Sequence, residues 1–544
     1  MPYPEWTEGS YQEAPTVPFP PLLSAPPAPT KPKGVSRRAI LVGAGAGALG
    51  VGAIGAGLGY VLSNRMASGS SGPANVFASD SQQIAHLLRR AGFGPWSKDF
   101  GDYIDAGVSG TIDRLLNYSS ISNAALDNLI NSLRLNFSLS ADLIRWFTLR
   151  MLYSTHPLEE KMTMFWHGVL VSGLDKGGKR MPPFLAQQNQ TLRQHCLGRF
   201  DDLIHAISID PAMLIYLDGA SSSGHLPNEN YSRELMELFT LGVTNPQGVP
   251  NYTQNDVHQG ALALTGWRIQ SNQGVYAASR HFNGAITYLG QTGKLGLNDV
   301  VRIVCSHPST PYHIAWRMWS FFAYPVAPTD SVLHPLVDSY HKNNHSIRAM
   351  VETMLRSTAF LSSKAYRQRI KSPVEFLVGA IRGLGIQTTL QTNALRALYV
   401  QLGQTPFDPP NVSGWDGDKV SQAWLSTQTW MARVNLINSL VVAATGSATR
   451  TQQTISGSKA VASSPVQQVI KERSIASTKE LVDYYVAAML DGNLEDNRKA
   501  TLYGAASQSA EGLAFTLSGG AKIPVASVRQ MLYLLMTMPE YQLN

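Results

Sequence analysis

The chain has only two cysteines and lacks the compact motifs of several common enzyme classes. Cys196 and Cys305 stand in unrelated contexts without the spacing of a metal site, which favours burial as reduced thiols, although pairing after export stays open. A Gly-x-Ser-x-Gly elbow, a His-Glu-x-x-His motif, a phosphate-binding loop and a Cys-x-x-Cys pair are all missing from the sequence. These absences remove the motif support for the corresponding hydrolases, metalloproteases, nucleotide-binding enzymes and thiol oxidoreductases.

Charge is also sparse. The chain has 44 Lys and Arg against 37 Asp and Glu, a formal net charge of +7 over 544 residues. Because no dense basic run occurs outside the N-terminal region, nucleic-acid binding is not expected. The hydrophobic fraction of 44% is enough for one large core or two ordinary ones, and no fixed-period repeat indicates a solenoid.

The N-terminal region differs in composition from the rest of the chain. Residues 1–35 are rich in proline and predict a disordered leader. In residues 36–78, Arg37 and Arg38 precede an apolar Gly/Ala run that ends at Leu62, a combination that resembles a twin-arginine export signal. We therefore expect export machinery of the twin-arginine type as a partner, and a location outside the cytoplasmic membrane. We leave open whether the protein is secreted or anchored at the outer face. Anchoring by this segment is an option because the apolar run is long enough to span a bilayer.

Residues 79–544 read as helices separated by short breaks rich in Gly, Pro, Asn and Asp. This pattern predicts a mainly α, large multi-helix globular domain with long irregular loops, built as a single domain. A low-complexity segment at about 445–465 is expected to be a flexible loop within it. Ser79 and Ser372 mark two helix starts, and Ser372-Pro373-Val374-Glu375 combines an N-cap, a first-turn proline and a capping-box glutamate. Other helices are expected over Ala141–Tyr153, Leu158–Val171, Ser421–Val441 and Val525–Met538.

The Pro-rich segment Gly403–Trp415 cannot be regular secondary structure. It contains Phe407 and Trp415, and ordered aromatic loops of this kind can line a binding groove or cover a hydrophobic core. The sequence leaves both interpretations open.

The stretch Asn228–Trp267 predicts two helices joined by a turn-rich loop. In the first helix an apolar stripe is made by Tyr231, Leu235, Leu238 and Leu241. Another face carries Asn230, Glu234 and Glu237, so that two carboxylates point the same way. The helix is expected to end at Gly242, and Thr253 to begin the second helix with Asp256 in the capping-box position.

The carboxylate pair supports two interpretations. Two acids on one helix face can bind a metal or act as general acid and base. They can also cap neighbouring helices or pair with arginines such as Arg233, because charged helix faces are usually solvated or paired.

Several blocks of the chain together resemble the signature of the DUF1800 family, large bacterial proteins named for having no known function. The blocks are NENYSRELMELFTLGV with YTQNDVHQGALALTGW, MTMFWHGVLVSG (162–173), HFNGAITYLG (281–290), HPSTPYHIAWRMWSFF (307–322), RIKSPVEFLVGAIRGLG (369–385), GQTPFDPPNVSGW (403–415) and the terminal MTMPEYQLN. The resemblance spans about residue 80 to the end. It implies a shared fold but no particular reaction.

The histidines of these blocks are candidate polar groups. His167 lies in the Phe-Trp-His block, although a histidine in a buried aromatic helix is more often satisfied by a carbonyl or carboxylate than by a metal. In relatives the loop at His281 resembles a His-Asp-x-Gly-x-Lys pattern, and here Phe282 and Ile286 replace the acid and the lysine. Phe239 stands where relatives often carry histidine. These departures reduce the polar groups available to a metal site.

We therefore predict an exported helical protein with a polar pocket around the Glu234/Glu237 helix, acting as a hydrolase-type or metal-dependent enzyme. A divalent metal is the cofactor that such a site would take, with one glutamate as ligand or base and His167 as ligand or proton shuttle. The candidate set, drawn from separate segments, is His167, Glu234, Glu237 and His281. Asp256 and Arg233 are expected to contact and orient these side chains without binding the metal themselves. The alternative is a non-catalytic cell-envelope or surface interaction protein in which the same carboxylates hold helices together.

Overall fold

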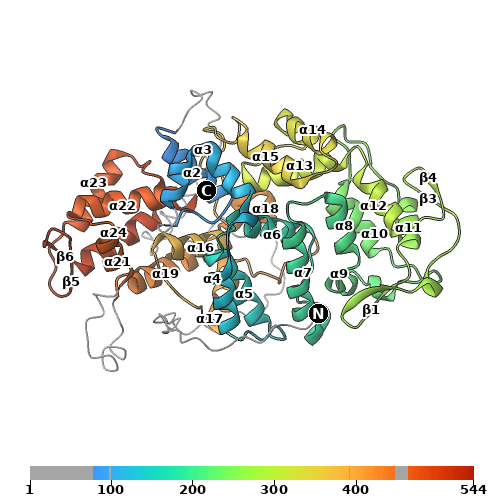
Figure 1. Ribbon diagram of the computed structural model, residues 1–544, viewed down its shortest axis with the longest axis horizontal. Helices are drawn as coiled ribbons and strands as arrows, with labels where there is room; N and C mark the ends of the chain where they lie inside the picture. The colour runs from blue at the N-terminus through green and yellow to red at the C-terminus, as the bar shows by residue number, and fades with distance from the viewer. Residues whose placement is uncertain (1–76, 97–99, 391, 447–463) are drawn as a thin grey trace, which may run out of the picture.

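The computed structural model describes residues 77–96, 100–390, 392–446 and 464–544 (Figure 1). The predicted leader, Arg37, Arg38 and most of the low-complexity segment lie outside these residues. Within the described part of the chain helices predominate, and strands form only two-stranded antiparallel sheets. The predicted mainly α class is therefore confirmed. No helix among the described residues is both long and apolar enough to cross a membrane.

The first helices of the fold all precede residue 228. They are α2 (Asp80–Arg90), α3 (Phe100–Leu116), η1 (Tyr118–Ser120), α4 (Ala124–Ser132), α5 (Ser140–Tyr153), α6 (Pro157–Val169), η2 (Gly178–Arg180), α7 (Met181–His195), α8 (Phe200–Ser208), α9 (Pro211–Tyr216) and η3 (Gly219–Ser221). The helix predicted over Leu158–Val171 is α6, which already ends at Val169.

The middle of the chain alternates helices with two hairpins. Its elements are α10 (Asn230–Glu234), η4 (Leu235–Thr240), α11 (Gln254–Ala263), β1 (Trp267–Gln270), β2 (Gln273–Tyr276), η5 (Ala278–Arg280), β3 (Ile286–Tyr288), β4 (Gln291–Gly293), α12 (Leu297–Cys305), α13 (Thr310–Phe322), η6 (Ser331–Leu333), α14 (His334–Lys342) and α15 (Ile347–Arg356). β1 pairs with β2 across Ser271 and Asn272, which both have positive φ, as two-residue hairpin turns require. The sequence did not predict these strands, because each is only three or four residues long.

The last part of the chain returns to helices. Its elements are α16 (Pro373–Gly383), α17 (Thr392–Leu402), α18 (Asp416–Lys419), η7 (Ser421–Trp424), α19 (Thr427–Ala444), α21 (Pro465–Glu472), α22 (Thr478–Leu490), α23 (Asp496–Ala506), β5 (Ala514–Thr516), β6 (Lys522–Pro524), α24 (Val525–Thr537) and α25 (Pro539–Gln542). The helix predicted from Ser421 begins only at Thr427, because Ser426 forms a capping box with Thr429 and separates the helix from the short turn before it.

Local capping chemistry fixes several helix starts as the sequence predicts. Ser79 caps α2, and its side chain accepts a hydrogen bond from the backbone of Gln82. At α16, Ser372 accepts from the backbone N–H of Glu375, while the Glu375 carboxylate accepts from the backbone N–H of Ser372 at 2.8 Å. These reciprocal bonds satisfy two donors that a helix end otherwise leaves free.

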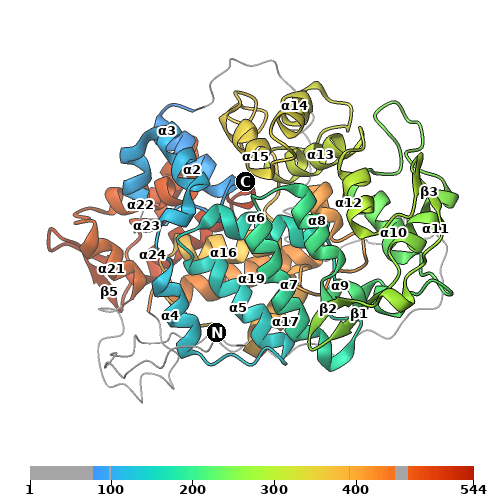
Figure 2. The same ribbon diagram turned by 45° about the vertical axis from the view of Figure 1, so that its right-hand side comes forward.

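Segments far apart in the sequence lie side by side in this fold. Figures 1 and 2 show β1–β4 with α9–α11 at one end, α21–α24 at the other, and α5, α6 and α16 between them. The blue helices α2 and α3 lie beside the red C-terminal helices. Buried side chains from Ile84 in α2 to Tyr541 in α25 belong to one contiguous hydrophobic cluster. The single-domain organisation of residues 79–544 stays a prediction.

The loop Gly403–Trp415 covers part of this core. It has no regular secondary structure, as predicted, and the side chains of Phe407 and Trp415 are buried. Both rings pack against His167, so the structure favours the core-covering interpretation of the loop. Cys196 and Cys305 are buried and unpaired, as expected.

A substitution at Gly260 in α11 can test the close packing of this helix against its neighbours. A Cβ at this position would lie 2.4 Å from Ser232 Oγ and 2.7 Å from Tyr288 Cε2. We expect Gly260→Ala to lower the free energy of unfolding by about 1–3 kcal/mol, measured by urea denaturation, because the added methyl overpacks this contact. At an exposed position of α23, a Cβ on Gly504 would meet nothing within 4 Å outside its own helix backbone. The control Gly504→Ala should therefore stabilise by about 0.5–1 kcal/mol. Equal effects of the two changes would contradict the packing argument.

Candidate functional site

The helix that carries the two glutamates changes its winding in the middle. It is α-helical over α10 and continues as a π-helix over η4, from Leu235 to Thr240. The backbone carbonyl of Leu238 accepts a hydrogen bond of 2.9 Å from Nε2 of His313, a residue of α13. Burial and the charge of Arg317 lower the pKa of His313 to about 4, so the ring is neutral and Nε2 carries the donated hydrogen. Short π-helical segments are rare and frequently mark functional sites.

Glu234 and Glu237 lie close together on this helix, and both are half-buried. Burial raises the pKa of Glu234, the negative charge of Glu237 raises it further, and Arg233 partly opposes the rise. Among the described residues, the Glu234 carboxylate has neither a hydrogen-bond donor nor an ion-pair partner. A carboxyl in this state holds its proton to a higher pH than a solvated glutamic acid does.

Glu237 is held by Tyr252, which precedes α11. The phenol hydroxyl of Tyr252 donates to Glu237 Oε2 at 2.7 Å. Burial, the hydrogen bond and the charge of Glu237 all raise the pKa of Tyr252, so the phenol remains a donor at neutral pH. The two carboxylates therefore have different surroundings, one fixed by a donor and the other without a partner.

Further polar groups come to the pair from the α6–α7 connection and α9. Burial raises the pKa of Tyr216 to about 12, and the charges of Asp175 and Glu234 make smaller contributions. Tyr216 therefore lies near Asp175 and Glu234. Lys176 Nζ donates to the carbonyl of Tyr216 at 2.7 Å and forms a 3.3 Å ion pair with Asp218. The sequence analysis missed these residues. The available signal was their position, because Asp175 and Lys176 lie two and three residues after the block 162–173.

The other predicted site residues lie in surroundings of their own. His167 is buried, and its Nε2 accepts a 3.0 Å hydrogen bond from the backbone N–H of Phe407. Burial lowers the pKa of His167 to about 4, so it is a neutral core histidine. Nδ1 of His281 donates to the carbonyl of Thr265 at 3.0 Å.

The structure does not bring the four predicted ligands together. In the described ranges, no three His, Cys, Asp or Glu residues form a group that could hold a metal ion. The ligand set of the metal hypothesis therefore does not converge on Glu234 and Glu237.

Asp256 and Arg233 tie secondary-structure elements together. Asp256 forms the predicted capping box with Thr253, and its other oxygen accepts from the backbone N–H of Leu289 at 3.0 Å. Arg233 forms an ion pair of 3.2 Å with Glu229, and both side chains also bond to Gln254 in α11. Neither residue contacts the carboxylate of Glu237, whose hydrogen bond comes from Tyr252.

Comparisons with known proteins give a family but no activity. A family model described as "Protein of unknown function (DUF1800)" matches residues 86–543. Neither a curated protein nor a solved structure matches the chain.

A substitution at His313 can test whether its hydrogen bond to Leu238 stabilises the π-helical segment. We expect His313→Phe, which keeps a ring but removes the donor to Leu238, to lower the free energy of unfolding by about 1–3 kcal/mol. Hydrogen exchange should also speed up at the amides of residues 235–242. His258→Phe is the matched control, because His258 is exposed and pairs only with Glu229. A loss no larger than that of the control would show that the His313 bond does not support the segment.

Proposed function

The chain belongs to the DUF1800 family, whose description assigns no function, and we propose that it is an exported hydrolase-type enzyme with Glu234 and Glu237 as its acid and base. The observation that carries the proposal is the asymmetry of the pair. Glu237 is oriented by Tyr252, whereas Glu234 has no partner among the described residues and a raised pKa. Carboxyl pairs whose environments drive their pKa values apart are typical of acid–base catalysis.

The two roles follow from this asymmetry. Glu234 retains a proton and donates it to the leaving group, while the Glu237 carboxylate accepts a proton from the attacking water. The water oxygen then forms the new bond as the bond to the leaving group breaks, and the proton taken up by Glu237 balances the one given by Glu234.

The proposed location rests on the N-terminal sequence. Arg37 and Arg38 with the following apolar run support export through the twin-arginine route, which carries folded proteins. The proposed mechanism assigns no step to a metal, because no third His, Cys, Asp or Glu side chain among the described residues forms a metal-binding group with the pair.

The second candidate is a non-catalytic cell-envelope or surface protein. The network that favours it joins Glu229, Arg233, Gln254 and His258 across α10 and α11, so acids of this region do hold helices together. If Glu234 and Glu237 have the same role, their loss should lower stability and change no reaction.

The pH dependence of stability tests the state of Glu234. Its raised pKa means that the folded protein binds this proton more tightly than the unfolded chain, so the stabilising effect is lost as pH rises through the folded pKa. We expect the Tm of Glu234→Gln, relative to the natural protein, to increase between about pH 4 and pH 7. Differential scanning calorimetry across that range measures the difference, and a constant difference would contradict the raised pKa.

Substitution of each acid tests the reaction. The folded protein should hydrolyse at least one member of a panel of ester, glycoside, peptide and phosphoester substrates. Glu234→Gln and Glu237→Gln should each lower that rate about 10²–10⁴-fold with the fold retained. Glu229→Gln is the matched control and should keep the rate, because Glu229 is held in the Arg233 network. A lower Tm in both site variants, together with no hydrolysis by the natural protein, would support the structural alternative.

A further inference from the structure

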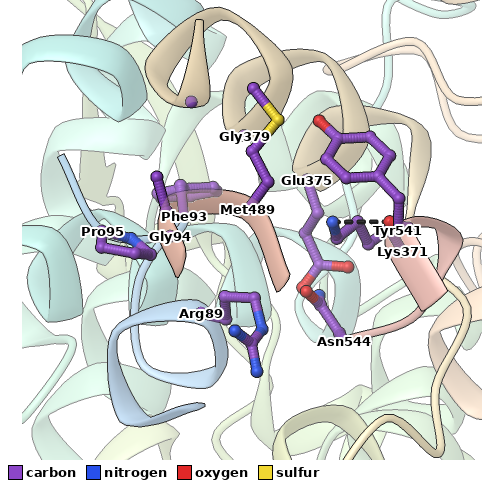
Figure 3. A pocket seen from close by; sticks show the side chains of 12 residues that line it. Arg89, Phe93, Gly94, Pro95, Lys371, Glu375, Gly379, Met489, Tyr541 and Asn544 are labelled. Atoms are coloured by element: carbon purple, nitrogen blue, oxygen red, sulfur yellow. Dashed lines mark hydrogen bonds between the residues drawn. The ribbon is translucent and has the colours of Figure 1, made fainter. Parts of the chain in front are cut away.

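A small cavity lies between α2, α16, α22 and the segment 541–544 (Figure 3). Its volume is about 30 Å³, which leaves room for a few water-sized groups. The polar side chains that line it are those of Arg89, Lys371, Glu375, Tyr541 and Asn544. The other lining residues are apolar or glycine. This cavity shares none of its lining residues with the carboxylate pair of the proposed active site.

The charged side chains around the cavity differ in their partners. Arg89 pairs with Asp491, and Glu375 pairs with Lys161 of α6. Lys371 is buried and, among the described residues, has no carboxylate partner; its Nζ donates to the Tyr541 carbonyl at 2.7 Å. Burial and the charge of Arg89 lower the pKa of Lys371 well below its usual range. The ammonium form of Lys371 is costly to bury without a negative partner, and an anion in the cavity would stabilise that form.

Three polar atoms of the lining side chains are buried without a hydrogen-bond partner. They are Nη2 of Arg89, Oη of Tyr541 and Nδ2 of Asn544. All three can donate a hydrogen bond, and the two nitrogens can only donate. A buried donor without a partner costs about 1–3 kcal/mol. Apart from the Tyr541 hydroxyl, which can also accept, no acceptor of these lining side chains is buried without a partner, so the described cavity mainly lacks acceptors.

We propose that this cavity binds a small oxyanion, of the inorganic phosphate or carboxylate class, which accepts from Arg89, Tyr541 and Asn544 and offsets the charge of Lys371. Water alone would satisfy the donors but would leave the ammonium form of Lys371 without a counter-charge. Repulsion of the ligand by the Glu375 carboxylate is reduced, because Lys161 forms an ion pair with this carboxylate and the Ser372 N–H donates a hydrogen bond to it. Bound there, the anion joins α2 to the segment 541–544.

Anion-dependent stability tests the site on the full chain. The protein is dialysed into chloride, and Tm is followed as phosphate, sulfate or acetate replaces chloride at constant ionic strength. We expect a saturable rise in Tm with phosphate or acetate, as ligand linkage requires. Acetate alone would identify a carboxylate ligand, and phosphate or sulfate a tetrahedral oxyanion. Ion chromatography of the denatured protein reports an anion that dialysis leaves bound.

Two tyrosines provide a matched pair of variants. Tyr541→Phe removes only an unpartnered hydroxyl at the cavity, and should raise the anion Kd about tenfold without loss of the fold. Tyr485 is also fully buried with an unpartnered hydroxyl but does not line the cavity, so Tyr485→Phe should keep the natural Kd. Lys371→Met should remove the saturable response. Equal responses in all variants, or neither retained anion nor a shift with any oxyanion, would overturn the proposal.

Discussion

The interaction on which the largest part of the fold depends is made by the buried carboxylate of Glu375, in the first turn of α16. Its carboxylate caps α16 through the Ser372 N–H and pairs with Lys161 from α6. Although burial opposes ionisation, the charges of Lys161, Arg369 and Arg90 lower the pKa of Glu375 to about 2. Removing one partner of such a buried pair typically costs roughly 3–5 kcal/mol. One side chain therefore fixes a helix start, an interhelical contact and the charge balance of the core.

The two proposed sites each leave one ionisable group without an ion-pair partner. Around Glu234 that group is a half-buried carboxyl, which remains in contact with solvent and can exchange a proton. Around Lys371 it is a buried amine, whose Nζ donates to the carbonyl of Tyr541. Since the cost of an unpaired charge grows with burial, the first region suits proton transfer and the second suits permanent occupation by a ligand.

Short-range rules explain what the sequence could predict. The caps at Ser79, Thr253 and Ser372 were predictable because every participant lies within four residues. The π-helical segment was not, since its Leu238 carbonyl is bonded by His313, 75 positions later. In the same way, the side chain of His167 is satisfied by a backbone group 240 residues away. The acid pair was proposed from helical spacing, whereas the neighbouring Tyr252 and Tyr216 could be identified only from the tertiary fold.

The pairing of α2 with distant segments also sets an order of events during synthesis. Arg89 meets Asp491 across 402 positions, and the backbone of residues 369–371 bonds to that of residues 542–544. At usual translation rates, α2 waits on the order of a minute after its own synthesis for these partners. During that interval its arginines must stay hydrated, and the surrounding apolar surface is open to chaperones or to aggregation. Contacts of such long range close last, so folding finishes only once the ribosome has passed the segment that closes the core.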